Sequence, residues 1–378
     1  MGEKKIGLGL IGCGNIGQIH SASFARLAEN GVPIRAVIAS DPLEEHRRAI
    51  SDNWRFEILS PDAGDVITHP EVDAVFLCTP TFTHRDLILS ILSANKHLYS
   101  EKPLAPDFET VKEICQEVAK NPVIAQVGFQ MRHNAMHASV KRMVERAEYG
   151  RPVGYLYRDD ECWPTTEFSC FASDWRSQGK LSGGGPLIEH SIHGIDLLAW
   201  LFGPPVRVSA ATRSVFGYDV EDVACLVIEH ESGVIGTLLS VYGGVEAREE
   251  SRFEVFFEKA TVEITWGVLV ESEENHFRIT RSGESPEDIP FEMILRERLS
   301  ELGLKFKPFF WNELASLDFF NSIQKAKPAC PGFGDALIAH AVVEAAYRSA
   351  SEKRMVELKE LLPAELAKAL SINCALSQ

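Results

Sequence analysis

The chain has 378 residues, about two to three times the usual length of one domain, so we expect two domains. With 45% hydrophobic and 24% charged residues it has the composition of a folded globular protein, which excludes a disordered chain and a disulfide-stapled miniprotein. Its formal net charge of -16 makes nucleic acids and anionic membrane surfaces poor partners, and no apolar run approaches the roughly 20 residues of a membrane helix.

The N-terminal stretch and the cysteines indicate a cytoplasmic protein. The first twelve residues, MGEKKIGLGLIG, are broken by glycines and lack the small-residue cleavage pattern of a signal peptide. The eight cysteines contain no C-x-x-C pair, which fits neither a disulfide framework nor a zinc site. We therefore expect reduced thiols and no metal.

The first third of the chain alternates short apolar runs with helical segments. Strands are expected at Lys5–Ile11, Ile34–Ala39, Ala74–Cys78, His97–Tyr99 and Val123–Val127, with helices to Ala28 and over His84–Ala94 and Asp107–Lys120. This alternation predicts a doubly wound parallel sheet with right-handed crossovers, in a domain covering residues 1–128.

After Gly128 the pattern changes to runs rich in β-branched residues. Strands are expected at Val206–Val215, Val223–Glu229, Val234–Val241, Phe253–Phe257 and Thr261–Thr265, with helices at Met136–Ala147, Leu187–Phe202 and Asp335–Ser351. The charge-rich stretch Ser272–Ser300 is the least interpretable part of the chain; no element is predicted there, and it is interpreted as a mobile excursion. Residues 129–378 are thus expected to form an α/β domain with an open, mostly antiparallel sheet.

A glycine-rich turn follows the first strand and opens the first helix. In Gly12–Gly17 (GCGNIG), backbone N–H groups and the positive helix end can hold a pyrophosphate, which predicts dinucleotide binding. Asp41 ends the second strand, where a carboxylate can accept hydrogen bonds from the adenosine ribose, so NAD is favoured. Two alternatives stay open: Asp41 caps the following helix, or Ser40 takes its place and Arg47 and Arg48 accommodate the 2′-phosphate of NADP.

The predicted mid-chain helix carries an acid and a histidine on one stripe. At about 100° per residue, Glu189, His193 and Asp196 share one face. Oxidation of an alcohol needs a base for the hydroxyl proton, and an imidazole oriented by a carboxylate suits that role. Asp196 is expected to form a structural cap or pair. His190 and His193 lack an evident third ligand, so a metal site is not expected.

Several motifs together resemble those of the Gfo/Idh/MocA family, named for glucose-fructose oxidoreductase and inositol dehydrogenase. They are GCGNIG, CTPTFTH at Cys78–His84, SEKPL at Ser100–Leu104, GGGPLIEHSIHGIDLL at Gly183–Leu198, and a closing AYRSASEKRMVEL. The resemblance implies a Rossmann domain, an α/β domain whose open sheet supports a homo-oligomer (dimer or tetramer), and a substrate held between them.

The resemblance also assigns roles to the reactive residues. Lys102, at the carboxyl edge of the parallel sheet, would lie near the nicotinamide and the substrate hydroxyl, where its charge stabilises the developing oxyanion, and Pro103 would follow a cis peptide. His193 matches the catalytic histidine. Glu189 stands where the family usually has Asp, so the acid is kept but its substrate contact is in doubt.

Further contacts are expected on the same basis. Thr81 stands where the family often has Asn. The cofactor-binding residues are expected to be Gly12, Gly14, Asn15, Ile16, Asp41, Thr79, Pro80, His84, Glu101 and Lys102. The substrate-binding residues are expected to be Gln130, Arg132, Trp163, Trp175, Arg176, Glu189 and His193. A purely structural role is the alternative for Gln130 and Arg132, and an ordinary aromatic surface loop is the alternative for the segment with Trp163, Trp175 and Arg176.

Together these features predict an NAD(P)-dependent oxidoreductase acting on a secondary alcohol of a sugar, cyclitol or related polyol. Two alternatives are an NAD-dependent glycosidase working by oxidation and elimination, and a non-catalytic regulator that senses NAD or a sugar. The sequence does not identify the substrate or whether the cofactor leaves after each turnover.

Overall fold

A computed structural model describes residues 4–162, 173–243, 250–267, 270 and 272–362 of the chain. The described residues divide into two compact units. The first unit contains residues 4–129 and 312–337, and the second contains residues 130–311 and 338–362. The chain thus leaves the first unit after Phe129 and later returns to it.

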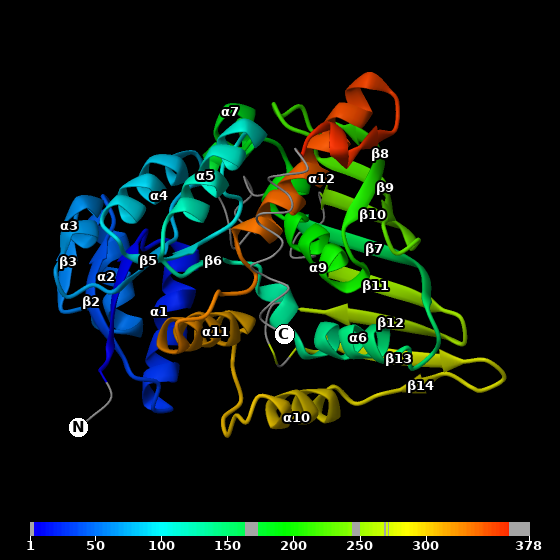
Figure 1. The fold of residues 1–378 in the computed structure, drawn as a ribbon, viewed down its shortest axis with the longest axis horizontal. Helices are drawn as coiled ribbons and strands as arrows, with labels where there is room; N and C mark the ends of the chain where they lie inside the picture. Colours follow the sequence, from blue (N-terminus) through cyan, green and yellow to red (C-terminus); the bar gives the residue numbers. More distant parts are fainter. Residues whose placement is uncertain (1–3, 163–172, 244–249, 268–269, 271, 363–378) are drawn as a thin grey trace. The chain divides into compact units, whose positions relative to one another are not determined.

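The first unit is built on a parallel sheet (Figure 1). Its elements before the crossover are β1 (Ile6–Ile11), α1 (Asn15–Glu29), β2 (Ile34–Ser40), α2 (Glu44–Asn53), β3 (Ile58–Ser60), α3 (Ala63–Thr68), β4 (Ala74–Leu77), η1 (Thr81–Thr83), α4 (His84–Ser93), β5 (His97–Ser100), α5 (Phe108–Lys120) and β6 (Ala125–Val127). Within the described residues the six strands run in the order β3-β2-β1-β4-β5-β6, the doubly wound order of a dinucleotide-binding fold.

An aromatic cluster fills one side of this sheet. Phe76 of β4 stacks on Tyr99 of β5 with ring centroids 4.6 Å apart, and Phe24 of α1 packs edge-on against Phe76 at 4.6 Å. The returning helix α11 (Trp311–Lys325) adds Phe319 and Phe320, whose centroids lie 5.6 and 5.7 Å from that of Phe76. The sheet core is therefore completed by a segment nearly two hundred residues later in the chain.

The second unit contains a larger, mostly antiparallel sheet. Its elements are η2 (Gln130–His133), α6 (Ala135–Arg146), β7 (Pro152–Cys162), η3 (Asp174–Ser177), α7 (Gly179–Ser182), α8 (Pro186–Glu189), α9 (Ile192–Phe202), β8 (Pro205–Arg213), β9 (Val223–His230), β10 (Ile235–Gly243), β11 (Glu250–Phe257), β12 (Ala260–Trp266), β13 (His276–Arg281), β14 (Glu287–Asp288), α10 (Phe291–Glu301), β15 (Val356–Glu357) and η4 (Leu358–Glu360). The last long helix, α12 (Phe333–Glu352), begins in the first unit.

Within the described residues this sheet has nine strands in the order β14-β13-β12-β11-β7-β10-β9-β8-β15. Its central pair, β7 and β10, is parallel, and its other neighbours are antiparallel. Helix α9 packs closely on β7, because a Cβ added at Gly194 would lie 2.6 Å from ring atoms of Tyr157. The two sheets confirm the predicted fold class.

Three sequence-based expectations for individual elements were wrong. The single helix expected over Leu187–Phe202 is two helices, α8 and α9, separated by His190 and Ser191. The stretch Ser272–Ser300, for which no element was predicted, forms β13, β14 and most of α10. The sequence patterns also missed β7, the central strand of the second sheet.

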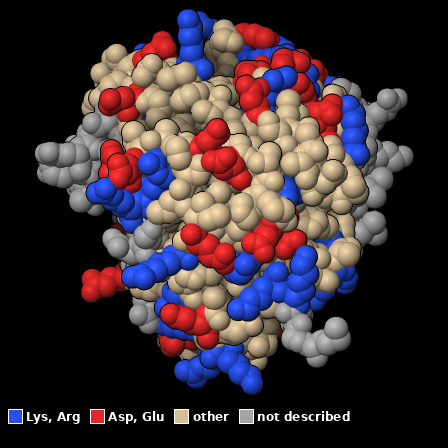
Figure 2. Space-filling view, turned by 90° about the vertical axis from the view of Figure 1, so that its left-hand side faces the viewer, with Lys and Arg blue, Asp and Glu red and all other residues tan. Residues whose placement is uncertain are grey.

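Among the described residues, no helix is both long and apolar enough to cross a bilayer. On the face drawn in Figure 2, acidic and basic side chains are interspersed with uncharged ones, so the negative charge there is not gathered into one block.

Candidate functional site

The glycine turn after β1 is shaped for a pyrophosphate. Gly12 has a φ of +94°, and a Cβ there would lie 2.5 Å from the carbonyl oxygen of Cys78. A Cβ at Gly17 would lie 2.1 Å from the carbonyl oxygen of Gly12. Gly14 is the N-cap residue of α1, and no side chain caps the helix there. A Cβ added at Gly14 would have no neighbouring heavy atom within 4 Å. The first backbone N–H groups of α1 are thus not covered by a capping side chain, which fits binding of the pyrophosphate of NAD.

Asp41 links the end of β2 to this turn. Its Oδ2 accepts a hydrogen bond of 2.9 Å from the backbone N–H of Cys13, and its Oδ1 accepts one of 2.9 Å from Leu43 N–H. Asp41 therefore braces the glycine turn and the residue before α2. It is not the cap of α2, because the N-cap residue is Leu43 and the helix has no side-chain cap. The carboxylate of Asp41 retains further lone pairs for ribose hydroxyls. Arg47 donates to the backbone carbonyl of Asp41 at 2.5 Å, and Arg48 pairs with Glu44.

The segment that carries Lys102 is fixed by a buried acid. Glu101 follows β5, is 4% exposed, and accepts a hydrogen bond of 2.7 Å from Nε2 of the fully buried His20 in α1. Gly128 leaves room for this carboxylate, because a Cβ there would lie 2.8 Å from its Oε2. The peptide between Lys102 and Pro103 is cis, as the family resemblance implied. His20 and Glu101 thus hold the backbone from which Lys102 extends.

The loop after β4 is organised around His84. Nε2 of His84 lies 2.8 Å from the carbonyl oxygen of Thr79, and burial lowers the pKa of this histidine. The hydroxyl of Thr83 lies 2.7 Å from that of Thr79, and Thr81 is 2% exposed in η1. His84 is therefore a buried ring that orders the Thr79–Pro80 turn, and its predicted contact with a cofactor stays a prediction.

In the second unit, three of the expected substrate-binding residues lie together. Glu189 at the end of α8 is 4% exposed, and its Oε2 accepts a hydrogen bond of 3.1 Å from Nε of Arg176. The guanidinium of Arg176 lies 4.5 Å from the ring centroid of Trp175. Trp163 lies outside the described residues. Arg176 and Glu189 therefore form a partly buried polar pair beside an aromatic ring.

His193 lies in the first turn of α9 and is 4% exposed. The chain between Glu189 and His193 contains a bulge, because the backbone N–H of Ser191 donates to the carbonyl of Pro186, five residues earlier, at 2.8 Å. The even 100° spacing assumed for Glu189 and His193 therefore does not apply across this junction.

Arg132 and Asp196 form a buried ion pair. Arg132 donates from Nε at 2.7 Å and from Nη2 at 2.5 Å to the two carboxylate oxygens of Asp196, and these residues are 6% and 1% exposed. This pair supports the structural alternative for Arg132 and the expected structural role of Asp196. Among the described residues, none hydrogen-bonds to the buried side-chain oxygen of Gln130, so its predicted contact with substrate stays a prediction.

Sequence reasoning missed the residues that shape the GGGP turn before α8. Glu221 accepts hydrogen bonds from the N–H of Gly185 at 2.8 Å and from the hydroxyl of Tyr347 at 3.0 Å. A Cβ at Gly184 would lie 2.0 Å from that hydroxyl, so this turn requires glycine. Tyr347 lies in the closing AYRSASEKRMVEL motif, whereas no pattern around Glu221 marks it.

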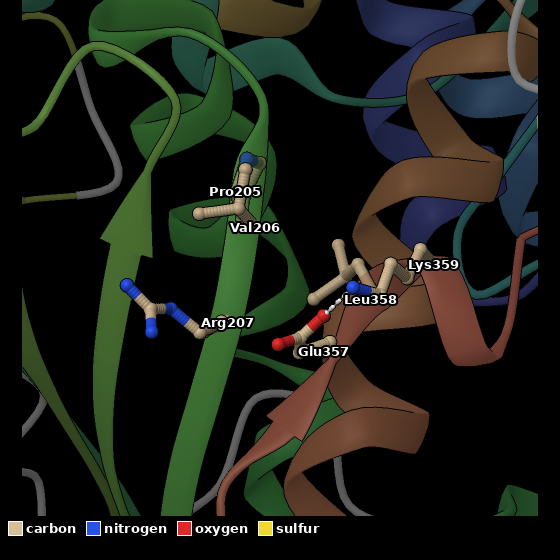
Figure 3. A pocket seen from close by; sticks show the side chains of 6 residues that line it. All are labelled: Pro205, Val206, Arg207, Glu357, Leu358 and Lys359. Atoms are coloured by element: carbon tan, nitrogen blue, oxygen red, sulfur yellow. Dashed lines mark ion pairs between the residues drawn. The ribbon is translucent and has the colours of Figure 1, made fainter.

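A surface hollow at one edge of the second sheet contains none of the predicted site residues. It is lined by Pro205, Val206, Arg207, Glu357, Leu358 and Lys359, where β15 pairs with β8 (Figure 3). Glu357 and Lys359 form an ion pair beside it. In the part of the chain that the structure describes, no three His, Cys, Asp or Glu side chains are grouped to hold a metal ion.

Three features define a dinucleotide-binding oxidoreductase. They are an open glycine turn at the start of α1, a strand order of 3-2-1-4-5-6, and a lysine after β5 whose backbone is held by Glu101 and His20. Comparison with known proteins agrees. Residues 6–129 match the oxidoreductase family's NAD-binding Rossmann fold, and residues 141–358 match its C-terminal alpha/beta domain. The chain belongs to the Gfo/Idh/MocA oxidoreductase family and is an NAD-dependent dehydrogenase, which confirms the predicted family, enzyme class and cofactor.

Individual relatives give a similar picture. The chain is 26% identical over 370 residues to myo-inositol 2-dehydrogenase of Thermotoga maritima, covering 94% of this chain and 99% of the relative. It is 28% identical over 242 residues to scyllo-inositol 2-dehydrogenase (NAD(+)) of Bacillus subtilis, covering 62% and 66%. A structure of levoglucosan dehydrogenase with NADH and levoglucosan shares the fold with a TM-score of 0.82 at 20% identity, covering 94% of this chain and 100% of that one.

Proposed function

We propose that this protein oxidises a secondary alcohol of a sugar, cyclitol or related polyol, with NAD as the acceptor of hydride. The observation that carries the proposal is that a chain of this family retains Lys102 after β5 and His193 at the start of α9. The names of its relatives, dehydrogenases of inositols and of levoglucosan, support a neutral, hydroxyl-rich substrate. In relatives of this kind, the reaction is reversible removal of hydrogen from a CH–OH group.

Each reactive residue has a distinct role in this proposal. His193 accepts the proton of the substrate hydroxyl, because a neutral imidazole is a good base near neutral pH. The ammonium group of Lys102 stabilises the negative charge that develops on the same oxygen. Glu189, held by Arg176, orients the substrate or the imidazole. Glu101 keeps the Lys102 backbone in place through its hydrogen bond with His20.

Substitution of the two reactive residues tests these roles. Each of Lys102→Ala and His193→Ala is expected to lower kcat by about 10²- to 10⁴-fold on the best substrate, found by screening inositols, anhydrosugars and aldoses for NADH formation. Lys120→Ala and His276→Ala, at exposed positions of the same residue types, are the matched controls and should retain full activity. Turnover within threefold of the wild type in both active-site variants would refute the assignment.

The same screen separates the alternative functions. A glycosidase working by oxidation and elimination would release a cleaved glycoside with no net NADH. A sensor would bind NAD and a polyol without turning either over.

Free thiols at Cys13, Cys78 and Cys115 agree with the predicted cytoplasmic location, which fractionation of the native cell would test.

We also propose that two or more copies assemble through the outer face of the second sheet. Leu156 of β7 and Val227 of β9 both lie opposite Thr237 of β10, so the three side chains form one row across the sheet. Leu156 is 48% exposed and the neighbouring Ile235 is 51% exposed, which is costly in water for large apolar side chains. Light scattering should show a dimer or tetramer that Leu156→Glu dissociates. A monomeric wild-type protein would overturn this proposal.

A further inference from the structure

The junction between α8 and α9 is anchored to the sheet by an ionic network of two buried carboxylates and His190, whose side chain is 22% exposed. Nε2 of His190 lies 3.3 Å from Oδ1 of Asp159, and its Nδ1 lies 3.1 Å from Oε2 of Glu161. Both acids are on β7, where Asp159 is fully buried and Glu161 is 7% exposed. One imidazole ring is therefore held between two carboxylates on adjacent inward positions of a central strand.

This geometry requires a doubly protonated ring. A neutral imidazole has one N–H group and one bare nitrogen, whereas both ring nitrogens of His190 face a carboxylate that can only accept. Burial alone would lower the pKa of His190, but the charges and hydrogen bonds of Asp159 and Glu161 raise it well above the ordinary value. The two carboxylate contacts thus favour the protonated form of His190.

The carboxylate of Asp159 is satisfied by further donors. Oγ of Ser251 on β11 lies 2.5 Å from its Oδ1, and Oγ of Ser191 lies 3.0 Å from its Oδ2. Oγ of Ser191 also lies 2.6 Å from that of Ser240 on β10. Although burial tends to raise the pKa of Asp159, His190 and these hydroxyls hold it below the ordinary value. The network therefore joins the junction to three adjacent strands.

The two anchored residues are those that make the bulge. His190 accepts a backbone hydrogen bond of 3.2 Å from the N–H of His193, and Ser191 makes the five-residue bond to Pro186. The side chains of both His190 and Ser191 are tied to Asp159. The path of the chain from Glu189 to His193 is consequently set by partners on the sheet, and not by helix geometry alone.

We propose that His190 is a positioning residue, a cation clamped between Asp159 and Glu161 that fixes the bulge and thereby the arrangement of Glu189 and His193. This inference rests on the proposed function, since it assigns His190 to the support of those two residues. His190 itself is not proposed to contact substrate or to exchange a proton during turnover. Its sequence position, one residue after the acid, gives no hint of this role.

The kinetic test replaces the cation by a neutral donor. His190→Gln is expected to lower kcat by about 10- to 100-fold, because a small displacement of a catalytic pair is costly, while the affinity for NADH measured by fluorescence stays unchanged. The apparent pKa on the acidic limb of the kcat/KM profile should rise, since a fixed positive charge near His193 is lost. His276→Gln is the matched control, because His276 pairs with Asp288 at 3.3 Å but is 42% exposed.

The outcomes distinguish a failure of the proposed function from a failure of the role proposed for His190. If His193→Ala retains activity, the proposed function fails. If His193→Ala loses activity while His190→Gln keeps kcat within twofold and leaves the pH profile unmoved, only the role of His190 fails. Should His190→Gln not fold, Glu161→Gln carries the same test, because it keeps an acceptor for His190 but removes one of the two charges.

Nuclear magnetic resonance gives a readout independent of activity. In protein labelled with ¹⁵N-histidine, the His190 signals, assigned by their loss in His190→Gln, should show both ring nitrogens protonated at pH 8. A neutral ring at that pH would overturn the proposal.

Discussion

Replacing Asp196 by Asn tests whether Arg132 supports the fold of the second unit. The pair is bidentate, with distances of 2.7 and 2.5 Å, and both side chains are nearly inaccessible to solvent. Removing one charge from such a pair leaves the other buried without its ion-pair partner, which costs about 3–5 kcal/mol of unfolding free energy. At roughly 2–4 °C per kcal/mol for a unit of this size, Asp196→Asn should lower Tm by about 6–20 °C.

The assay combines urea unfolding with calorimetry and includes the reciprocal variants. Arg132→Met should lose a similar free energy, partly because its guanidinium also lies 5.9 Å from the ring centroid of Trp200. The double variant Arg132→Met/Asp196→Leu should be more stable than either single variant, because it removes both charges together. A Tm within about 2 °C of the wild type in Asp196→Asn, or a raised KM for substrate without loss of stability in Arg132→Met, would refute this reasoning.

Other predictions follow from single contacts. Gly12→Ala should weaken NADH binding at least tenfold by titration, since the φ of +94° and the 2.5 Å approach to the Cys78 carbonyl both exclude a side chain; unchanged affinity would contradict the assigned role of the turn. His20→Phe keeps the ring packing but removes the donor to Glu101, so urea unfolding should show a loss of about 1.5–3 kcal/mol, and a loss below about 0.5 would count against the bond. His137 is buried, and burial lowers its pKa to about 4, below the roughly 6.5 of the unfolded chain. The unfolded chain therefore binds one more proton between these values, so His137 should remove about 1.4 kcal/mol of stability per pH unit as pH falls from about 6.5 to 4. His137→Phe should lose this part of the slope, and an unaltered slope would show that His137 is not its source.

The parallel sheet was predictable because its strands are buried on both faces. The run from Ala74 to Leu77 is continuously apolar, and all four residues are buried in β4. The glycine turn was recognisable because its function requires glycine at fixed positions beside a helix. The three-residue strand β3 was missed because Ile58 and Leu59 are exposed and the strand is too short to show a period.

The central strand of the second sheet was missed for a different reason. In β7, Asp159 and Glu161 occupy inward positions where a strand pattern normally shows apolar residues. Their partner, His190, whose side chain is 22% exposed, lies about thirty residues away, and nothing local links them. The same pairing explains the wrong prediction of one long helix, since the break at His190 is produced by side chains bound to the sheet. Local pattern could therefore propose Glu189 and His193 as site residues, but it could not predict the contacts with the sheet that set their spacing.

The return of the chain through α11 limits how the nucleotide-binding half can be isolated. A fragment ending at Phe129 would lack the carboxylate of Glu313, which lies 2.8 Å from Nε of Arg26, and would uncover the rings beneath Phe319 and Phe320. Such a fragment should aggregate, whereas one that rejoins residues 312–337 through a flexible linker should stay monodisperse and bind NADH. For protein engineers, the smallest exchangeable cofactor module is thus discontinuous in sequence.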